Sequence, residues 1–282
     1  MGRNIKFSFL LCTLNREELL RRCVNSLLEQ SYDKYEIVII DQSDNINYDY
    51  QNSECIKYYH VSEKGLSRSR NLGLQFCEGD FIALIDDDAV YDHNYLKEAN
   101  ETIENTNDVG ILAGRIKDPI TGEYLLPHMI EANTINIKWN SIFDYCMSAA
   151  MIIHKSILSD GFDMDFGIGA QYGAGEETDI VIKTLIEKKR VIYNPALIVY
   201  HKSNTDIIDY TRTYNYSVGF GALYKKYYLK NRKILWGWLY IKSLIKSMGG
   251  ILLYSIGNKK YKRSLYSLKG KIDGFKKYTL GD

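Results

Sequence analysis

The chain has 282 residues, of which 45% are hydrophobic and 25% are charged. This ordinary globular composition argues against a disordered chain and allows one large domain with an appendage. The net charge of +1 conceals an asymmetry, because residues 225–282 carry 13 lysines and 2 arginines against two aspartates. We therefore expect an acidic body and a basic C-terminal region that meets an anionic partner.

The five cysteines are scattered along the chain without a Cys-x-x-Cys pair. Neither a zinc site nor a disulfide framework is expected, and a reducing compartment fits best. The first residues lead directly into an apolar run, with no signal-peptide pattern. A cytoplasmic protein is the resulting expectation.

Apolar runs and helical patterns alternate through the first 90 residues. Buried strands are predicted at 5–12, 36–41, 56–61 and 81–85, and helices at 19–28 and 65–76. This alternation is typical of an α/β fold with a doubly wound, mostly parallel sheet. Ligands of such sheets bind beyond the carboxyl ends of the strands. Thr13, Asp41 and Asp86 lie at the carboxyl ends of three such strands and are expected to converge.

The second half of the sequence is less regular. It predicts a strand at 109–116, a loop at 118–128, a glycine- and acid-rich segment at 162–175, a helix at 176–187 and two short strands around Pro195. Beyond residue 210 the pattern is helical, aromatic and basic. We therefore predict a catalytic domain at 1–205 and a helical, basic region at 206–282.

Three adjacent carboxylates, Asp86, Asp87 and Asp88, come directly after the predicted strand at 81–85. A divalent cation would relieve their mutual repulsion, and hard oxygen ligands suit Mg²⁺ or Mn²⁺. Such an ion could stabilise the charge of a leaving nucleoside diphosphate. The alternative is an acidic helix cap or a solvated turn.

Several further motifs accompany the aspartates in a fixed order. They are CTLNR at 12–16, EIVIIDQSD at 36–44, GLSRSRNLGL at 65–74, GDFIALIDDD at 79–88, GFDMDFG at 161–167, GAGEETDI at 173–180 and NPALIVYH at 194–201. This ordered set resembles the inverting family 2 glycosyltransferases of the GT-A fold, of the bacterial surface-polysaccharide type. The resemblance implies a Rossmann-like GT-A domain that moves a sugar from a nucleoside diphosphate, UDP or dTDP, to a hydroxyl of a glycan or lipid-linked acceptor.

The resemblance also implies roles for individual residues. Those expected to bind the nucleotide sugar are Thr13, Asn15, Arg16, Asp41, Arg70, Asn71, Asp86 and Asp87. Asp86 and Asp88 fill the D-x-D positions, although DDD replaces the more usual D-x-D-D. Asp88 would bind Mn²⁺ or Mg²⁺ directly, Asp86 would contact ribose or the metal through water, and His201 would complete the metal site or touch the diphosphate.

The acids at 176–179 are the candidates for the catalytic base. An inverting transfer needs a carboxylate to deprotonate the acceptor hydroxyl as it attacks. By resemblance Glu177 occupies the base position, with Glu in place of the commoner Asp, and Glu176 is the alternative. A helix start that is acidic only because it favours the helix dipole is the non-catalytic interpretation.

The segment 234–257 is apolar and aromatic, but Lys242 and Lys246 interrupt it near the middle. Buried lysines argue against a spanning helix. With Trp236, Trp238 and flanking lysines, the pattern predicts a helix lying on an anionic membrane surface, and hence a peripheral protein on the inner face of the cell membrane. A helical hairpin packed on the enzyme is the alternative, and no nucleic-acid partner is expected.

Three other functions fit the sequence less well. A sugar nucleotidyltransferase shares the sheet and the aspartates, but its glycine-rich first loop has no counterpart in CTLNREE. A processive synthase would need a QxxRW motif and spanning helices. A non-catalytic, membrane-bound scaffold with a degenerate site fits poorly with the acids retained at 86–88 and 176–179. The sequence therefore predicts a metal-dependent, inverting hexosyltransferase that adds single sugars.

Overall fold

The computed structural model describes residues 5–45, 54–202, 209–230, 233–254 and 258–279, which form two compact units. Unit 1 comprises Met1–Phe162 and Glu177–Ser203, and unit 2 comprises Asp163–Glu176 and Asn204–Asp282. The predicted boundary between residues 205 and 206 lies outside the described residues. The loop Asp163–Glu176 clusters with the C-terminal helices, although the sequence predicted it within 1–205.

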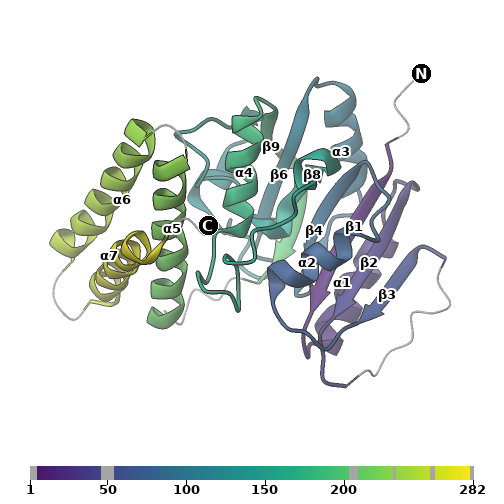
Figure 1. The fold of residues 1–282 in the computed structure, drawn as a ribbon. Coiled ribbons are helices and arrows are strands. Elements are labelled where there is room, and N and C mark those ends of the chain that lie inside the picture. The colour runs from purple at the N-terminus through teal and green to yellow at the C-terminus, as the bar shows by residue number, and fades with distance from the viewer. Residues whose placement is uncertain (1–4, 46–53, 203–208, 231–232, 255–257, 280–282) are drawn as a thin grey trace. The chain divides into compact units, whose positions relative to one another are not determined.

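Within the described residues, unit 1 is built on a nine-stranded sheet of order β3-β2-β1-β4-β8-β6-β9-β5, with β7 beside β9 (Figure 1). The strands are β1 Phe7–Thr13, β2 Tyr35–Asp41, β3 Ile56–His60, β4 Phe81–Asp86, β5 Ala89–Tyr91, β6 Val109–Lys117, β7 Ile135–Asn136, β8 Met151–His154 and β9 Arg190–His201. The first four strands in this order run parallel, whereas β8 lies antiparallel between β4 and β6. The predicted α/β fold is confirmed, with a mixed second half.

Helices cover both faces of this sheet. They are α1 Glu17–Leu28, α2 Leu66–Leu74, α3 Tyr95–Glu104 and α4 Glu176–Ile186. Neighbouring side chains of a strand point to opposite faces. Leu10 lies against Gly73 of α2, whereas Phe9 contacts Tyr91, which packs edge-on against Tyr95 of α3. The apolar run of β1 is therefore buried on both sides, as a doubly wound sheet requires.

Two features of the second half differ from the prediction. The sequence did not indicate β5, α3, β7 or β8. It also predicted two strands around Pro195, whereas the structure has the single strand β9. Its pairing with β6 shifts register between the pairs Ala113–Tyr193 and Arg115–Ile198. Because proline cannot donate a ladder hydrogen bond, Pro195 lies in an irregularity of the strand rather than ending it.

Unit 2 contains three long helices in its described residues: α5 Tyr210–Lys230, α6 Lys233–Leu253 and α7 Lys259–Lys277. Helices α5 and α7 approach each other at glycines. A Cβ added at Gly221 would lie 2.2 Å from the backbone oxygen of Lys271, and one at Gly274 only 2.0 Å from that of Val218. The two helices are therefore in backbone contact, which only the absence of a side chain permits.

Helix α6 completes this unit through aromatic packing. Trp236 stacks on Tyr227 with ring centroids 5.1 Å apart, and Tyr240 stacks on Phe275 of α7 at 4.1 Å. The helical C-terminal region is thus confirmed, although residues 255–257 of the predicted segment lie outside the described part. No helix within that part combines the length and the apolarity that a bilayer crossing requires.

Replacing Gly274 with alanine is expected to destabilise unit 2, because the new methyl group meets the Val218 backbone and not a movable side chain. Overpacking of this kind lowers the free energy of unfolding by about 1–3 kcal/mol. Thermal unfolding followed by circular dichroism measures the loss. Gly249→Ala on α6 is the matched control, since no atom lies within 4 Å of its added Cβ. It should be neutral or slightly stabilising, and equal melting of the two variants would contradict the backbone contact.

Candidate functional site

The strand register brings the predicted polar strand ends to one edge of the sheet. Thr13 at the end of β1 pairs with Asp41 on β2, and its neighbour Cys12 pairs with Asp86 on β4. All three strands are parallel, so their carboxyl ends meet where ligands of such sheets bind. The candidate site is this edge.

Asp87 is turned into the protein and joins two strand ends. Its side chain is buried, and its Oδ2 accepts a 2.6 Å hydrogen bond from Thr13 Oγ1. Its Oδ1 accepts a 2.9 Å hydrogen bond from Arg16 Nη1. Burial raises the pKa of Asp87. The hydrogen bond from Thr13 and the positive charge of Arg16 oppose that rise. Asp87 therefore fixes the loop after β4 against β1.

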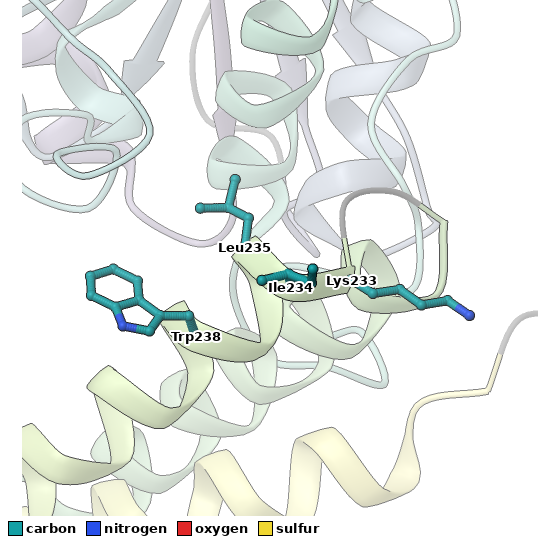
Figure 2. A pocket seen from close by; sticks show the side chains of 4 residues that line it. All are labelled: Lys233, Ile234, Leu235 and Trp238. Atoms are coloured by element: carbon teal, nitrogen blue, oxygen red, sulfur yellow. The ribbon is translucent and has the colours of Figure 1, made fainter.

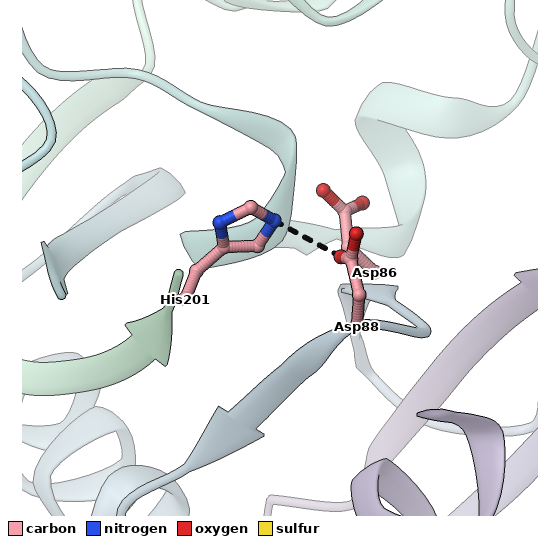
Figure 3. Close-up of side chains that lie close together, drawn as sticks. All are labelled: Asp86, Asp88 and His201. Carbon is pink, nitrogen blue, oxygen red and sulfur yellow. Dashed lines mark ion pairs between the residues drawn. The ribbon is translucent and has the colours of Figure 1, made fainter. Parts of the chain in front are cut away.

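Asp86 and Asp88 instead face His201 (Figure 3). His201 Nε2 lies 3.0 Å from Asp88 Oδ1, and the three residues each offer a ligand atom within 4.8 Å of the others. The hydrogen bond between His201 and Asp88 raises the pKa of the imidazole and lowers the pKa of the carboxyl group. The antiparallel pairing of β5 with β9 places His201 opposite Ala89, directly after Asp88. We refer to Asp86, Asp88 and His201 as the acidic cluster.

Positive charge reaches the acidic cluster from two helices. Arg16 at the start of α1 lies with Nη1 3.1 Å from Asp88 Oδ2 and is half exposed. Arg70 of α2 is buried, with Nη2 3.8 Å from Asp86 Oδ1 and its guanidinium over the Phe162 ring. Desolvation raises the pKa of Asp86, and the Arg70 charge opposes that rise. Both arginines thus lie where an anionic group bound at the cluster would meet them.

Both polar atoms of the Asn71 side chain bind the protein's own backbone. Its Nδ2 donates to the Phe162 carbonyl at 2.9 Å, and its Oδ1 accepts from the Phe162 N–H at 2.7 Å. This paired contact fixes the residues that precede the loop Asp163–Glu176. The expected contact of Asn71 with base and diphosphate stays a prediction.

The remaining predicted nucleotide residues lie at the end of β2 and in the loop after β1. Asp41 is fully buried and accepts hydrogen bonds from Tyr58 Oη at 2.6 Å and from the Ser43 N–H at 2.8 Å. Asn15 has a positive φ of 55° and exchanges two hydrogen bonds with Asp44, of 2.9 and 3.0 Å. Sequence reasoning singled out neither Tyr58 nor Ser43. Ser43 lies within the EIVIIDQSD motif and donates to Asp41 two residues before it, whereas Tyr58 reaches Asp41 only through the pairing of β2 with β3.

The three acids that begin α4 differ in exposure. Glu176 is 5% exposed, and Asp179 is fully buried with Lys183 Nζ 3.2 Å away. Glu177 is half-buried. Of the three, Glu177 is therefore the most exposed residue.

The segment 146–148 lies beside the acidic cluster. Burial and the charge of Glu177 together raise the pKa of Cys146 to about 12. Two residues later, Ser148 Oγ lies 3.5 Å from Asp86 Oδ1. The segment 146–148 therefore borders the acidic cluster through Ser148. Ser148 was not predicted as a site residue, and nothing in the local sequence distinguishes it.

Comparison with known proteins identifies the family. The model of "Glycosyl transferase family 2" matches residues 8–162, more than half of the chain. The chain belongs to this family. It is 28% identical over 120 residues to the glucosyl-dolichyl phosphate glucuronosyltransferase of Haloferax volcanii, a match covering 40% of this chain and 38% of that protein. The chain spans less than half the length of the curated relatives it matches first.

Solved structures show the same fold. Residues 1–349 of TarS from S. aureus, in complex with UDP-GlcNAc, superpose with a TM-score of 0.60 at 15% identity, covering 98% of this chain and 93% of that one. The mannosyltransferase PcManGT from Pyrobaculum calidifontis, in complex with GDP-Man and Mn²⁺, gives 0.63 at 13% identity, covering 96% and 87%. The family 2 chain therefore has the GT-A fold, and family membership disfavours the nucleotidyltransferase alternative.

Thr13→Val is expected to lower the free energy of unfolding, because it weakens the contact between β1 and the loop after β4. It keeps the shape of the side chain but removes the hydroxyl that donates to buried Asp87. A buried acceptor that loses a hydrogen-bond donor lowers the stability of the fold by about 1–3 kcal/mol. Urea unfolding measures the change, with Thr13→Ser as the control that retains the hydroxyl. Equal unfolding midpoints for the two variants would show that this hydrogen bond does not support the fold.

Proposed function

We propose that this protein transfers a sugar from a UDP- or dTDP-sugar to a hydroxyl of a glycan or lipid-linked acceptor, with inversion, in surface polysaccharide synthesis. The acidic cluster at the carboxyl edge of a family 2 sheet is the observation that carries the proposal. TarS and PcManGT share the fold and hold nucleotide sugars in their structures. The name of the Haloferax volcanii relative specifies a lipid-linked acceptor, which supports a location at a membrane, and we propose its cytoplasmic face.

The residues of the acidic cluster fit a divalent ion. Two carboxylates and one imidazole converge within 4.8 Å, and a mixed oxygen and nitrogen set of this kind accepts Mn²⁺ or Mg²⁺. Asp88 and His201 would hold the ion, with Asp86 beside them. A bound ion supplies Lewis-acid stabilisation of the leaving diphosphate. Arg16 is half exposed beside Asp88 and would bind the diphosphate directly, whereas buried Arg70 would act through Asp86.

Exposure supports Glu177 as the catalytic base. The acceptor oxygen forms a bond to the anomeric carbon while the bond to the diphosphate breaks, and the hydroxyl proton passes to a carboxylate. Glu176 and Asp179 are buried, and Asp179 pairs with Lys183. Glu177 is the acid of the motif that solvent reaches.

Asp88→Asn is expected to abolish metal-dependent donor binding, because an amide is a weak ligand beside His201. A thermal-shift screen of UDP- and dTDP-sugars with Mn²⁺ identifies the donor, since a ligand of the native state raises the melting temperature. Calorimetry with that nucleotide and Mn²⁺ then compares the variant with the wild type. Unchanged affinity would refute the assignment of the metal.

Asp108→Asn is the matched control for this measurement. Asp108 is an exposed aspartate directly before β6. Strand β6 runs in the same direction as β4, because both are antiparallel to β8. Asp108 therefore lies at the opposite edge of the sheet, and its neutralisation should leave donor binding unchanged.

Glu177→Gln is expected to lower kcat by about 100- to 10,000-fold, the usual cost of losing a general base. Donor affinity should change little, because glutamine keeps the shape of the side chain and the donor is held by other residues. The rate of sugar transfer, with calorimetry for the donor, separates these two effects. Normal donor binding without transfer in the wild type would instead favour the scaffold alternative.

Glu176→Gln is the control for the register of the motif. Its carboxylate is buried, so its loss should leave most of the transfer rate intact. An inactive Glu176→Gln together with an active Glu177→Gln would assign the catalytic base to Glu176. If both variants are active, the motif is only an acidic helix start, and the proposed base is wrong.

A further inference from the structure

An apolar stripe runs along the outer side of α6. Its members are all between 50% and 91% exposed: Ile234, Trp238, Ile241, Ile245, Met248 and Leu252. They are spaced alternately four and three residues apart, which places them on one side of the helix over about five turns. Single exposed apolar side chains are normal, but a contiguous stripe marks an interaction surface. We call these six residues the α6 stripe.

The opposite side of α6 already serves the fold of unit 2. Trp236 and Leu239 are buried, and Trp236 packs on the rings of Tyr224 and Tyr227. Tyr240 stacks on Phe275 of α7. Helix α6 is therefore held in place without the α6 stripe, whose side chains contribute little to the core of the unit.

Positive charges border the α6 stripe. Lys233, Lys242 and Lys246 are exposed on the same helix, which contains no acidic residue. The first two turns of α7 add four more exposed cations: Lys259, Lys260, Lys262 and Arg263. Asp273 is the single acid within α5, α6 and α7, and it accepts a 2.7 Å hydrogen bond from Tyr214. The surface around the stripe is thus almost uniformly basic.

A hollow lies at the N-terminal end of the stripe. It is lined by Lys233, Ile234, Leu235 and Trp238, and Figure 2 shows the Trp238 ring and the Lys233 chain extending away from the helix. An indole and an ammonium group beside apolar side chains are the groups that settle at the boundary between lipid headgroups and hydrocarbon.

The spacing of the stripe also fits a two-helix coiled coil, so a second copy of the chain is the competing occupant. Two copies packed through this face would bring Lys242 and Lys246 near the same lysines, with no acid on α6 to pair with them. An anionic leaflet offers phosphate groups to every lysine and hydrocarbon to the stripe. We propose that the outer face of α6 docks on an anionic lipid surface, with the α6 stripe inserted and the lysines at the headgroups. This goes beyond the proposed transfer reaction and does not depend on it.

Co-sedimentation of the full chain with vesicles tests this docking. We expect binding to phosphatidylcholine vesicles that contain phosphatidylglycerol, weak binding to phosphatidylcholine alone, and a loss of binding at high salt. Ile241→Ser/Ile245→Ser should lower the affinity by about 10-fold or more, because two large apolar side chains no longer insert. Both are more than half exposed, so the melting temperature should be retained.

Matched variants separate the stripe from general surface effects. Ile120→Ser/Ile130→Ser removes two isoleucines of unit 1 that are at least as exposed, and should bind vesicles like the wild type. Lys242→Glu/Lys246→Glu should lower the affinity at low salt by about 10-fold or more. Lys97→Glu/Lys138→Glu, which reverses two exposed lysines of unit 1, should have little effect.

Three results would overturn the proposal. The first is equal binding to neutral and anionic vesicles, and the second is unaltered binding by Ile241→Ser/Ile245→Ser. The third is a wild-type dimer in sedimentation velocity that this variant converts to a monomer without vesicles, which would assign the stripe to a second copy. The thermal shift of a nucleotide sugar is measured independently of lipid, so a failure of docking and a failure of the proposed transferase activity are distinguishable.

Discussion

The hydrogen bond from Thr13 to Asp87 determines how the candidate site is arranged. It joins the end of β1 to the loop after β4 in the interior of the protein, at 2.6 Å. With Asp87 turned inward, Asp86 and Asp88 are the carboxylates left to face His201. The three adjacent aspartates are therefore not equivalent. The middle one supports the structure, and the outer two form the group that can hold a cation.

Charge compensation explains why distant segments must meet at this edge. Three carboxylates in sequence repel one another, and each has an arginine or histidine neighbour from a different element. Arg16 comes from the start of α1, Arg70 from α2 and His201 from the end of β9. Because β5 pairs with β9, the strand that follows the aspartates is also the strand that positions the histidine. The acidic cluster thus depends on both halves of the sheet.

The first half of the fold was predictable because its signals are local. The strands and helices predicted in the first 90 residues are present with bounds shifted by at most two residues. Strand β8 inserts between β4 and β6, and β5 pairs with a strand more than 100 residues away, and neither pairing leaves a periodic pattern. Residue types also could not show that both polar atoms of Asn71 are used by Phe162. The sequence indicated which residues gather at the carboxyl edge of the sheet. The tertiary contacts of those residues decide which of their polar atoms remain available to a ligand.

The C-terminal helices carry more than a basic surface, because they also hold the loop that leads into the candidate base. Lys226 of α5 is buried and donates a 2.8 Å hydrogen bond to Asp163 at the start of that loop. Gly219 of α5 allows the backbone of Ala174 to approach closely, near the end of the loop. The division between the two units then falls between Glu176 and Glu177. The residue proposed to accept the proton is therefore joined covalently to a loop that the helices of unit 2 hold, so the two proposals share a stretch of chain while remaining separately testable.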